Sequence, residues 1–135
     1  YALLDERDFA PRPNYWAALL WSRLMGPRVL ALDAATPTLR RYAHCLKGVS
    51  GGVALVAINL GRAAAGIDFA GKGRAFVLAG ADADRAITMN GARLVLGARD
   101  ALPALDGTTV MGSAPVAPFG VTFVALPEAK SPACR

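Results

Sequence analysis

The carboxylates near the start of the chain are the first side chains that could do chemistry. Asp5, Glu6 and Asp8 lie almost side by side, and the other glutamate, Glu128, lies close to the end of the chain. Acid-base hydrolysis can be performed by two carboxylates roughly 5 to 10 Å apart. An acidic loop is more often a solvated surface or a source of negative charge at a helix start. We expect that simpler role for these three residues.

The other reactive residue types are sparse. His44 is the one histidine, which leaves little material for a zinc site or a Ser-His-Asp triad, so we predict no metal and no cofactor. Asp82 and Asp84 stand in an Ala/Gly-rich stretch, which indicates a turn rather than a calcium site. Gly71-Lys72-Gly73 and Gly51-Gly52 lack the strand, loop and helix of a phosphate site, and we predict turns there.

The two cysteines, Cys45 and Cys134, are far apart and form no CxxC motif. Their spacing leaves two interpretations open. They are either two free buried thiols or the two halves of a disulfide.

Composition limits the classes of protein to consider. With 135 residues the chain is long enough for one core, and 54% hydrophobic against 19% charged residues excludes a disordered chain. The longest apolar run, Val53 to Ile58, is far short of the roughly 20 residues of a membrane span. The net charge of +5 suits an anionic partner. However, the basic residues are scattered, with Arg40-Arg41 the one adjacent pair, so nucleic-acid binding is not predicted.

The first 27 residues differ in pattern from the rest. Residues 15–25 place Trp16, Leu19, Leu20 and Leu24 on one side at helical spacing, Pro13 suits the first turn, and Gly26-Pro27 is a stop signal. Trp16 and Trp21 are predicted to pack rather than to stack on sugars. Upstream, residues 1–4 can end a strand that is followed by a loop. This part predicts a strand, a loop and a helix.

After Pro27, short β-type runs alternate with turn residues, which is typical of a sandwich or barrel. The Met89-Asn90-Gly91-Ala92 sequence predicts a hairpin, because Asn-Gly tolerates the positive φ angles of a type I′ turn. The run at 53–59 is apolar on both faces, as a central strand would be. The predicted strands are 29–32, 39–46, 53–59, 67–69, 74–78, 87–89, 93–96 and 119–126. The fold class is therefore mostly β.

Several segments, in order, resemble heparanase-type glycosidases of glycoside hydrolase family 79. The first is Tyr1-Ala2-Leu3-Leu4-Asp5-Glu6, continuing through Phe9, Pro11, Pro13-Asn14-Tyr15-Trp16, Leu19-Leu20, Leu24-Met25-Gly26 and Val29-Leu30. The later ones are Leu39-Arg40, Tyr42-Ala43-His44-Cys45, Ala57-Ile58-Asn59-Leu60, Asn90-Gly91 and the tail from Pro118-Phe119 to Cys134. The similarity spans nearly the whole chain.

The resemblance implies the C-terminal portion of such an enzyme. Residues 1–27 would be the last strand-loop-helix segment that closes a (β/α)₈ catalytic barrel, and residues 28–135 would be a C-terminal β-sandwich. Heparanases are retaining endo-β-glucuronidases that cleave glucuronide linkages in heparan sulfate, and relatives act on other glucuronide-bearing molecules. An acidic polysaccharide is therefore the expected substrate.

The resemblance also implies roles for particular residues. Tyr1 matches a tyrosine that lines the substrate cleft, so we expect it to bind substrate. Cys45 and Cys134 match a disulfide that closes the sandwich, which would contribute about 4 kcal/mol and implies a secreted or periplasmic protein. The catalytic glutamates of the family lie on earlier barrel strands. We therefore expect this chain to be part of a longer protein in which further residues precede Tyr1. We expect the isolated chain to be inactive.

The expected partner is an N-terminal chain that carries the rest of the barrel and contributes one strand to the sandwich. An alternative is a non-catalytic carbohydrate-binding or structural β-sandwich, which would need exposed aromatic residues outside the first helix. The available ones are Tyr42, Phe69, Phe76, Phe119 and Phe123.

Overall fold

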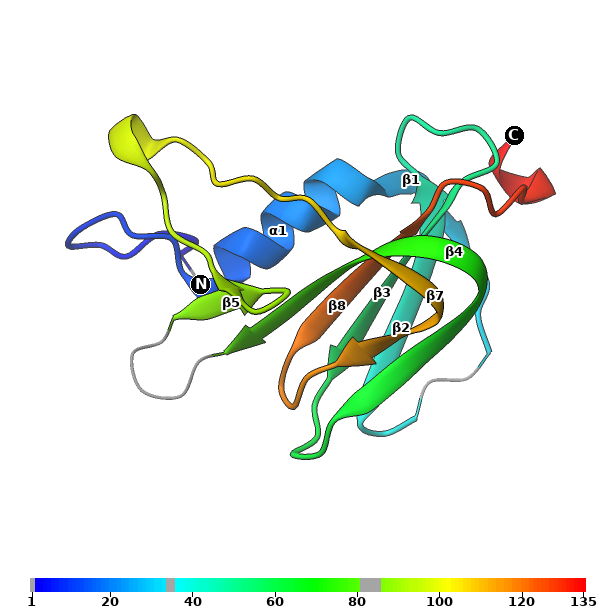
Figure 1. Ribbon diagram of the computed structural model, residues 1–135, viewed down its shortest axis with the longest axis horizontal. Helices are drawn as coiled ribbons and strands as arrows, with labels where there is room; N and C mark the ends of the chain where they lie inside the picture. The colour runs from blue at the N-terminus through cyan, green and yellow to red at the C-terminus, as the bar shows by residue number, and fades with distance from the viewer. Residues whose placement is uncertain (1, 34–35, 81–85) are drawn as a thin grey trace.

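The computed structural model describes residues 2–33, 36–80 and 86–135, in which a helix precedes an antiparallel β-sheet (Figure 1). The strands lie in the order β1-β2-β3-β8-β4-β5-β6, and β7 pairs with β4 off this path. The elements are α1 (Pro13–Leu24), β1 (Met25–Leu30), β2 (Leu39–Leu46), β3 (Val53–Asn59), β4 (Ala65–Gly80), β5 (Ile87–Met89), β6 (Ala92–Arg93), β7 (Thr108–Val116), β8 (Val121–Leu126), and the 3₁₀ turns η1 (Ala98–Asp100) and η2 (Pro132–Cys134).

The predicted helix is present and packs through the predicted side. Pro13 occupies its first turn, and Trp16 and Leu20, four residues apart, are buried at 2% and 1% exposure. The chain leaves the helix at Leu24 and enters β1 at once, earlier than the predicted strand start at residue 29. Gly26 permits this, because a Cβ there would lie 2.5 Å from the carbonyl oxygen of Cys45 in β2.

The sheet is covered on both faces. Alternate residues of β3 enter different apolar clusters, Val56 on the side of α1 and Leu55 on the other side. The first cluster includes Trp16, Leu20, Phe76 and Phe123. The second includes Ile67 of β4 and Val116 of β7, so the first half of β4 and β7 cover the face away from the helix, in front of β2, β3 and β8 in Figure 1. The prediction of a central strand at 53–59 is confirmed.

The predicted hairpin is also confirmed. Asn90 and Gly91 have φ angles of 50° and 83°, and Met89 pairs with Ala92. The second strand is shorter than predicted, ending at Arg93.

Three predictions were wrong. Gly71-Lys72-Gly73 is not a turn between strands 67–69 and 74–78 but lies within β4, where the pairing with β7 shifts register between Asp68 and Lys72. Strand β7 at 108–116 was not predicted. Residues 2–4 form no strand in the described chain, because Leu4 finds only Pro11 of its own loop to pair with.

Candidate functional site

The acidic residues of the N-terminal loop, residues 2–12, organise the loop itself. The Asp5 carboxylate accepts hydrogen bonds from the backbone N–H of Arg7 at 3.0 Å and from Nη2 of Arg12 at 3.3 Å. Asp8 accepts one from the backbone N–H of Ala10 at 3.0 Å. The Arg7 amide and the Arg12 guanidinium hold the pKa of Asp5 below its usual range. Glu6 and Asp8 are exposed, as expected for a solvated acidic loop, whereas the first turn of α1 contains no acidic residue.

Backbone hydrogen bonds close the same loop and present Phe9 to solvent. Asp5 N–H donates to the Ala10 carbonyl at 2.9 Å, and Phe9 N–H donates to the Asp5 carbonyl at 3.0 Å. Phe9 has a φ of 56° and is 69% exposed. A bulky residue in this conformation costs about 1–3 kcal/mol and persists only where the surrounding structure determines it.

A hollow of about 1070 Å³ opens between this loop and residues 86–102. We call it the N-terminal hollow. Its walls carry the apolar side chains of Leu4, Phe9, Val95 and Leu102 together with charged residues, which are Asp5, Asp8, Arg12, Arg93 and Asp100. The N-terminal loop and η1 lie at the same end of the molecule in Figure 1. A second hollow, lined by residues of β4 and β7 among others, has about 430 Å³.

Tyr1, the predicted substrate-binding residue, lies outside the described residues, as do Asp82 and Asp84. The segment that follows Tyr1 is attached to the start of α1. Arg12 N–H donates to the Leu3 carbonyl at 2.9 Å, and Nδ2 of Asn14 donates to the Ala2 carbonyl at 3.5 Å. The role of Tyr1 remains a prediction.

The two glutamates are not brought together. Glu6 belongs to the N-terminal loop and Glu128 to the segment between β8 and η2, and these segments lie toward opposite ends of the molecule in Figure 1. In the described parts of the chain, no group of three or more His, Cys, Asp or Glu could hold a metal ion. Over the same residues, no helix has the length and apolar character to cross a membrane.

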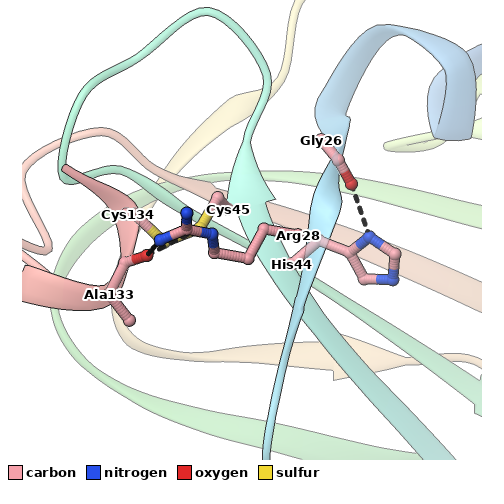
Figure 2. The surroundings of a disulfide bond; sticks show 6 residues. All are labelled: Gly26, Arg28, His44, Cys45, Ala133 and Cys134. Carbon is pink, nitrogen blue, oxygen red and sulfur yellow. Dashed lines mark hydrogen bonds between the residues drawn. A yellow bond between two sulfur atoms is a disulfide. The ribbon is translucent and has the colours of Figure 1, made fainter.

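Cys45 of β2 and Cys134 of η2 form a disulfide, which confirms the pairing implied by the resemblance. Other contacts tie the same tail to the sheet. Gly51 N–H donates to the Cys134 carbonyl at 2.8 Å, and the Arg28 guanidinium reaches across to the Ala133 carbonyl (Figure 2). The disulfide therefore reinforces a docking that the backbone already makes.

His44, for which no role was predicted, joins β2 to β1. Its Nδ1 lies 2.6 Å from the Gly26 carbonyl oxygen (Figure 2), and Nδ1 must donate, because a carbonyl oxygen can only accept. The ring also meets Trp21 edge-on at 5.2 Å. Trp21 is 41% exposed, so the packing predicted for it is partial.

The sequence did not predict the structural role of two asparagine side chains, Asn59 and Asn90. Asn59 is 3% exposed, and its Nδ2 donates to the carbonyls of Ala63 at 2.8 Å and Ala117 at 3.1 Å. The side-chain amide of Asn90 bonds to the backbone of β4, accepting from Val77 N–H at 2.9 Å and donating to the Ala75 carbonyl at 3.0 Å. The bonding partners are backbone groups, which carry no signature in the sequence.

Comparison with known proteins found relatives named as heparanases, heparanase-like proteins or a β-glucuronidase. The chain is 54% identical over 61 residues to heparanase-like protein 1 of Arabidopsis thaliana, covering 44% of this chain and 11% of that protein. It is 33% identical over 138 residues to baicalin-β-D-glucuronidase of Scutellaria baicalensis, covering 94% and 26%. It is 38% identical over 88 residues to human inactive heparanase-2, covering 53% and 15%.

Each of these relatives is therefore much longer than the matched region. No family model matches the chain. Among solved structures, a GH30 endoxylanase from Clostridium papyrosolvens C71 superposes with a TM-score of 0.53 at 17% identity, covering 87% of this chain and 28% of that one. This similarity is one of fold, and the matched region is 28% of that longer chain.

Proposed function

Since the chain is related to heparanase-type glycosidases, we propose that it is the C-terminal part of a secreted retaining endo-β-glucuronidase. The enzyme would hydrolyse glucuronide linkages in heparan sulfate or a related acidic polysaccharide. Its proton donor and nucleophile would lie in the N-terminal part, since the two glutamates of this chain are in separate segments. The isolated chain would be inactive.

The observation that carries this proposal is the match to a β-glucuronidase over 94% of the chain. Relatives whose names include heparanase align to parts of the same chain. The name of the first relative specifies a β-D-glucuronide, and the net charge of +5 is compatible with an anionic substrate.

The proposed division follows the predicted one. Residues 1–27 would close a (β/α)₈ barrel and residues 28–135 would form a β-sandwich, with an N-terminal chain supplying the rest of the barrel. The way in which β4 and β7 cover the second face of the sheet supports the sandwich. The packing of Trp16 and Leu20 on the sheet would join the barrel segment to it.

Tyr1 would line the substrate cleft and donate a hydrogen bond to a sugar or its carboxylate. The hydrogen bond from the Arg12 backbone N–H to the Leu3 carbonyl supports this, because it holds the backbone two residues after Tyr1 against the start of α1. A secreted or periplasmic location is supported by the disulfide, because such bonds persist in oxidising compartments.

The test uses the complete polypeptide, meaning this chain together with the proposed N-terminal part. It should release p-nitrophenol from p-nitrophenyl β-D-glucuronide or shorten heparan sulfate, with a β-configured first product. Replacing Tyr1 by Phe should lower kcat/KM about tenfold, the effect of losing one hydrogen bond to a charged group. A complete polypeptide that folds and cleaves no glucuronide would contradict the proposal.

A second candidate is a non-catalytic structural or sugar-binding module. Inactive heparanase-2 among the relatives favours it, because that protein is described as lacking the activity. Of the aromatic residues outside α1, Phe76 and Phe123 are buried, whereas Tyr42 and Phe119 are 46% and 66% exposed. Binding of heparan sulfate without cleavage by the complete polypeptide would favour this candidate.

A further inference from the structure

We propose that the N-terminal hollow is the docking surface for the remainder of the glycosidase polypeptide, with Phe9 as its anchor. The inference rests on the proposed function, which supplies that partner. It adds the residues through which this chain is held.

Large apolar side chains gather at the hollow although both faces of the sheet are already covered. Leu4, Phe9, Val95 and Leu102 are 38%, 69%, 54% and 41% exposed, and all of them line it. Contiguous exposed apolar surface of this kind marks a contact site, whereas single exposed residues need no explanation.

Both walls of the hollow are preorganised. The loop that presents Phe9 is closed by the hydrogen bonds of Asp5 described above. On the opposite wall Arg99 and Asp100 have φ angles of 56° and 58°, and Gly97 N–H closes the turn on the Ala101 carbonyl at 2.7 Å. A surface held in one conformation loses little entropy on binding, which favours a permanent contact.

The charges around the hollow favour a polypeptide over the acidic substrate. Three acidic residues, Asp5, Asp8 and Asp100, line the hollow together with two basic ones, Arg12 and Arg93. An acidic polysaccharide would meet negative charge here, despite the net positive charge of the chain. An apolar centre with charges of both signs around it is typical of contacts between protein parts.

The lengths of the relatives indicate that the remainder of a comparable polypeptide is large enough to cover the hollow. The chain matches 26% of the length of baicalin-β-D-glucuronidase and 11% of heparanase-like protein 1. The remaining length of a comparable polypeptide must contact this chain somewhere. Among the described residues, the N-terminal hollow combines a concave surface of about 1070 Å³ with an exposed aromatic side chain, Phe9, whereas the hollow lined by Ala75 and Val110 has about 430 Å³ and no aromatic lining residue.

Hydroxyl-radical footprinting of the complete polypeptide tests the proposal and has an internal control. Phe119 matches Phe9 in type, with a φ of 51° and 66% exposure, but lies outside the hollow. We expect loss of modification at Phe9 and retained modification at Phe119 in the folded polypeptide, and modification of both in urea. Equal modification of the two residues in the folded state would overturn the proposal.

Other occupants give different results. Protection of Phe9 that appears only when a glucuronide-bearing oligosaccharide is added would identify a sugar site. Protection that is lost on dilution would identify a second copy. Either result overturns the proposal. Glucuronidase activity is read from the same sample, so a protected Phe9 in an inactive polypeptide would support docking and contradict the proposed function.

A pair of variants gives a second measurement. Phe9→Asp in the complete polypeptide should lower the unfolding temperature and speed proteolytic separation of the two parts, because it buries a charge in the contact. Phe119→Asp should leave both near wild type. Equal effects of the two substitutions would contradict the proposal. If Phe9→Asp does not fold, the wild-type footprint decides.

Discussion

Asn59 lies in the interior of the protein and holds three segments of chain together. Its amide bonds to Ala63 and Ala117, and its Oδ1 accepts from Gly61 N–H at 2.8 Å. Replacing Asn59 by Ala removes all of these part-buried hydrogen bonds and the buried amide that makes them, so we expect the free energy of unfolding to fall by about 2–4 kcal/mol. Urea denaturation measures this. Asn14→Ala is the control, because its one bond is long and exposed; equal losses from the two variants would contradict the prediction.

Asp5 should make stability depend on pH. Its folded-state pKa is lowered, first by the Arg7 backbone hydrogen bond and then by Arg12. A lowered pKa means that the contribution is present above the unfolded-state value and is lost as the pH falls through the folded-state value. The difference in unfolding free energy between wild type and Asp5→Asn should therefore shrink between about pH 6 and about pH 2. A difference that is constant over this range would show that the carboxylate charge is not the cause.

What the sequence predicts at the residue scale depends on where the bonding partner lies. The φ angles of Asn90 and Gly91 are a local property of an Asn-Gly pair and were predicted. The bonds from Asn90 to Val77 and from Asn59 to Ala117 join residues far apart in the chain, and any residue type offers the same backbone groups. Cys45 and Cys134 are 89 residues apart, and only the resemblance to a family indicated their pairing.

At the scale of the elements, the disulfide should be the principal covalent stabiliser of the tail. Reduction, or replacement of both cysteines by Ser, should lower the free energy of unfolding by about 4 kcal/mol, because it releases a long loop in the unfolded chain. The measurement is urea denaturation with and without reductant. The Cys45→Ser, Cys134→Ser double variant is the control and should not respond to reductant. An unchanged wild-type midpoint under reducing conditions would show that the backbone contacts of the tail suffice.

Strand prediction succeeded where burial shapes the sequence and failed where it does not. Strand β3 is buried on both faces, so its apolar run predicted its bounds. Among the described strands, β7 pairs with β4 alone. It contains Gly112 and Pro115, and these residue types are rare inside strands but tolerated at a sheet edge. In β4, Gly71 and Gly73 indicated a turn, but they lie at or next to an irregularity in the pairing with β7, where the register shifts between Asp68 and Lys72. This bulge lets the single strand β4 continue from the face away from α1 into the main sheet.

At the scale of the whole molecule, the exposed apolar surface has a testable consequence. Besides the residues of the N-terminal hollow, the described chain exposes Val29 of the edge strand β1 at 67% and Met111 of β7 at 69%. An edge strand can pair with a strand from another chain, and apolar patches associate. The composition, with 54% hydrophobic residues, already predicted more apolar surface than a free-standing domain carries.

We therefore expect the isolated 135-residue chain to self-associate and to cleave no glucuronide, and the complete polypeptide to be monodisperse. Light scattering after size-exclusion chromatography measures the self-association of each sample, and release of p-nitrophenol measures glucuronide cleavage. Phe9→Asp should reduce self-association of the isolated chain, because it removes an exposed apolar side chain. In the complete polypeptide the same substitution should lower the unfolding temperature, because there the side chain is proposed to be buried in the contact. A monodisperse isolated chain would count against the N-terminal partner. A monodisperse chain that also bound heparan sulfate would favour the non-catalytic module.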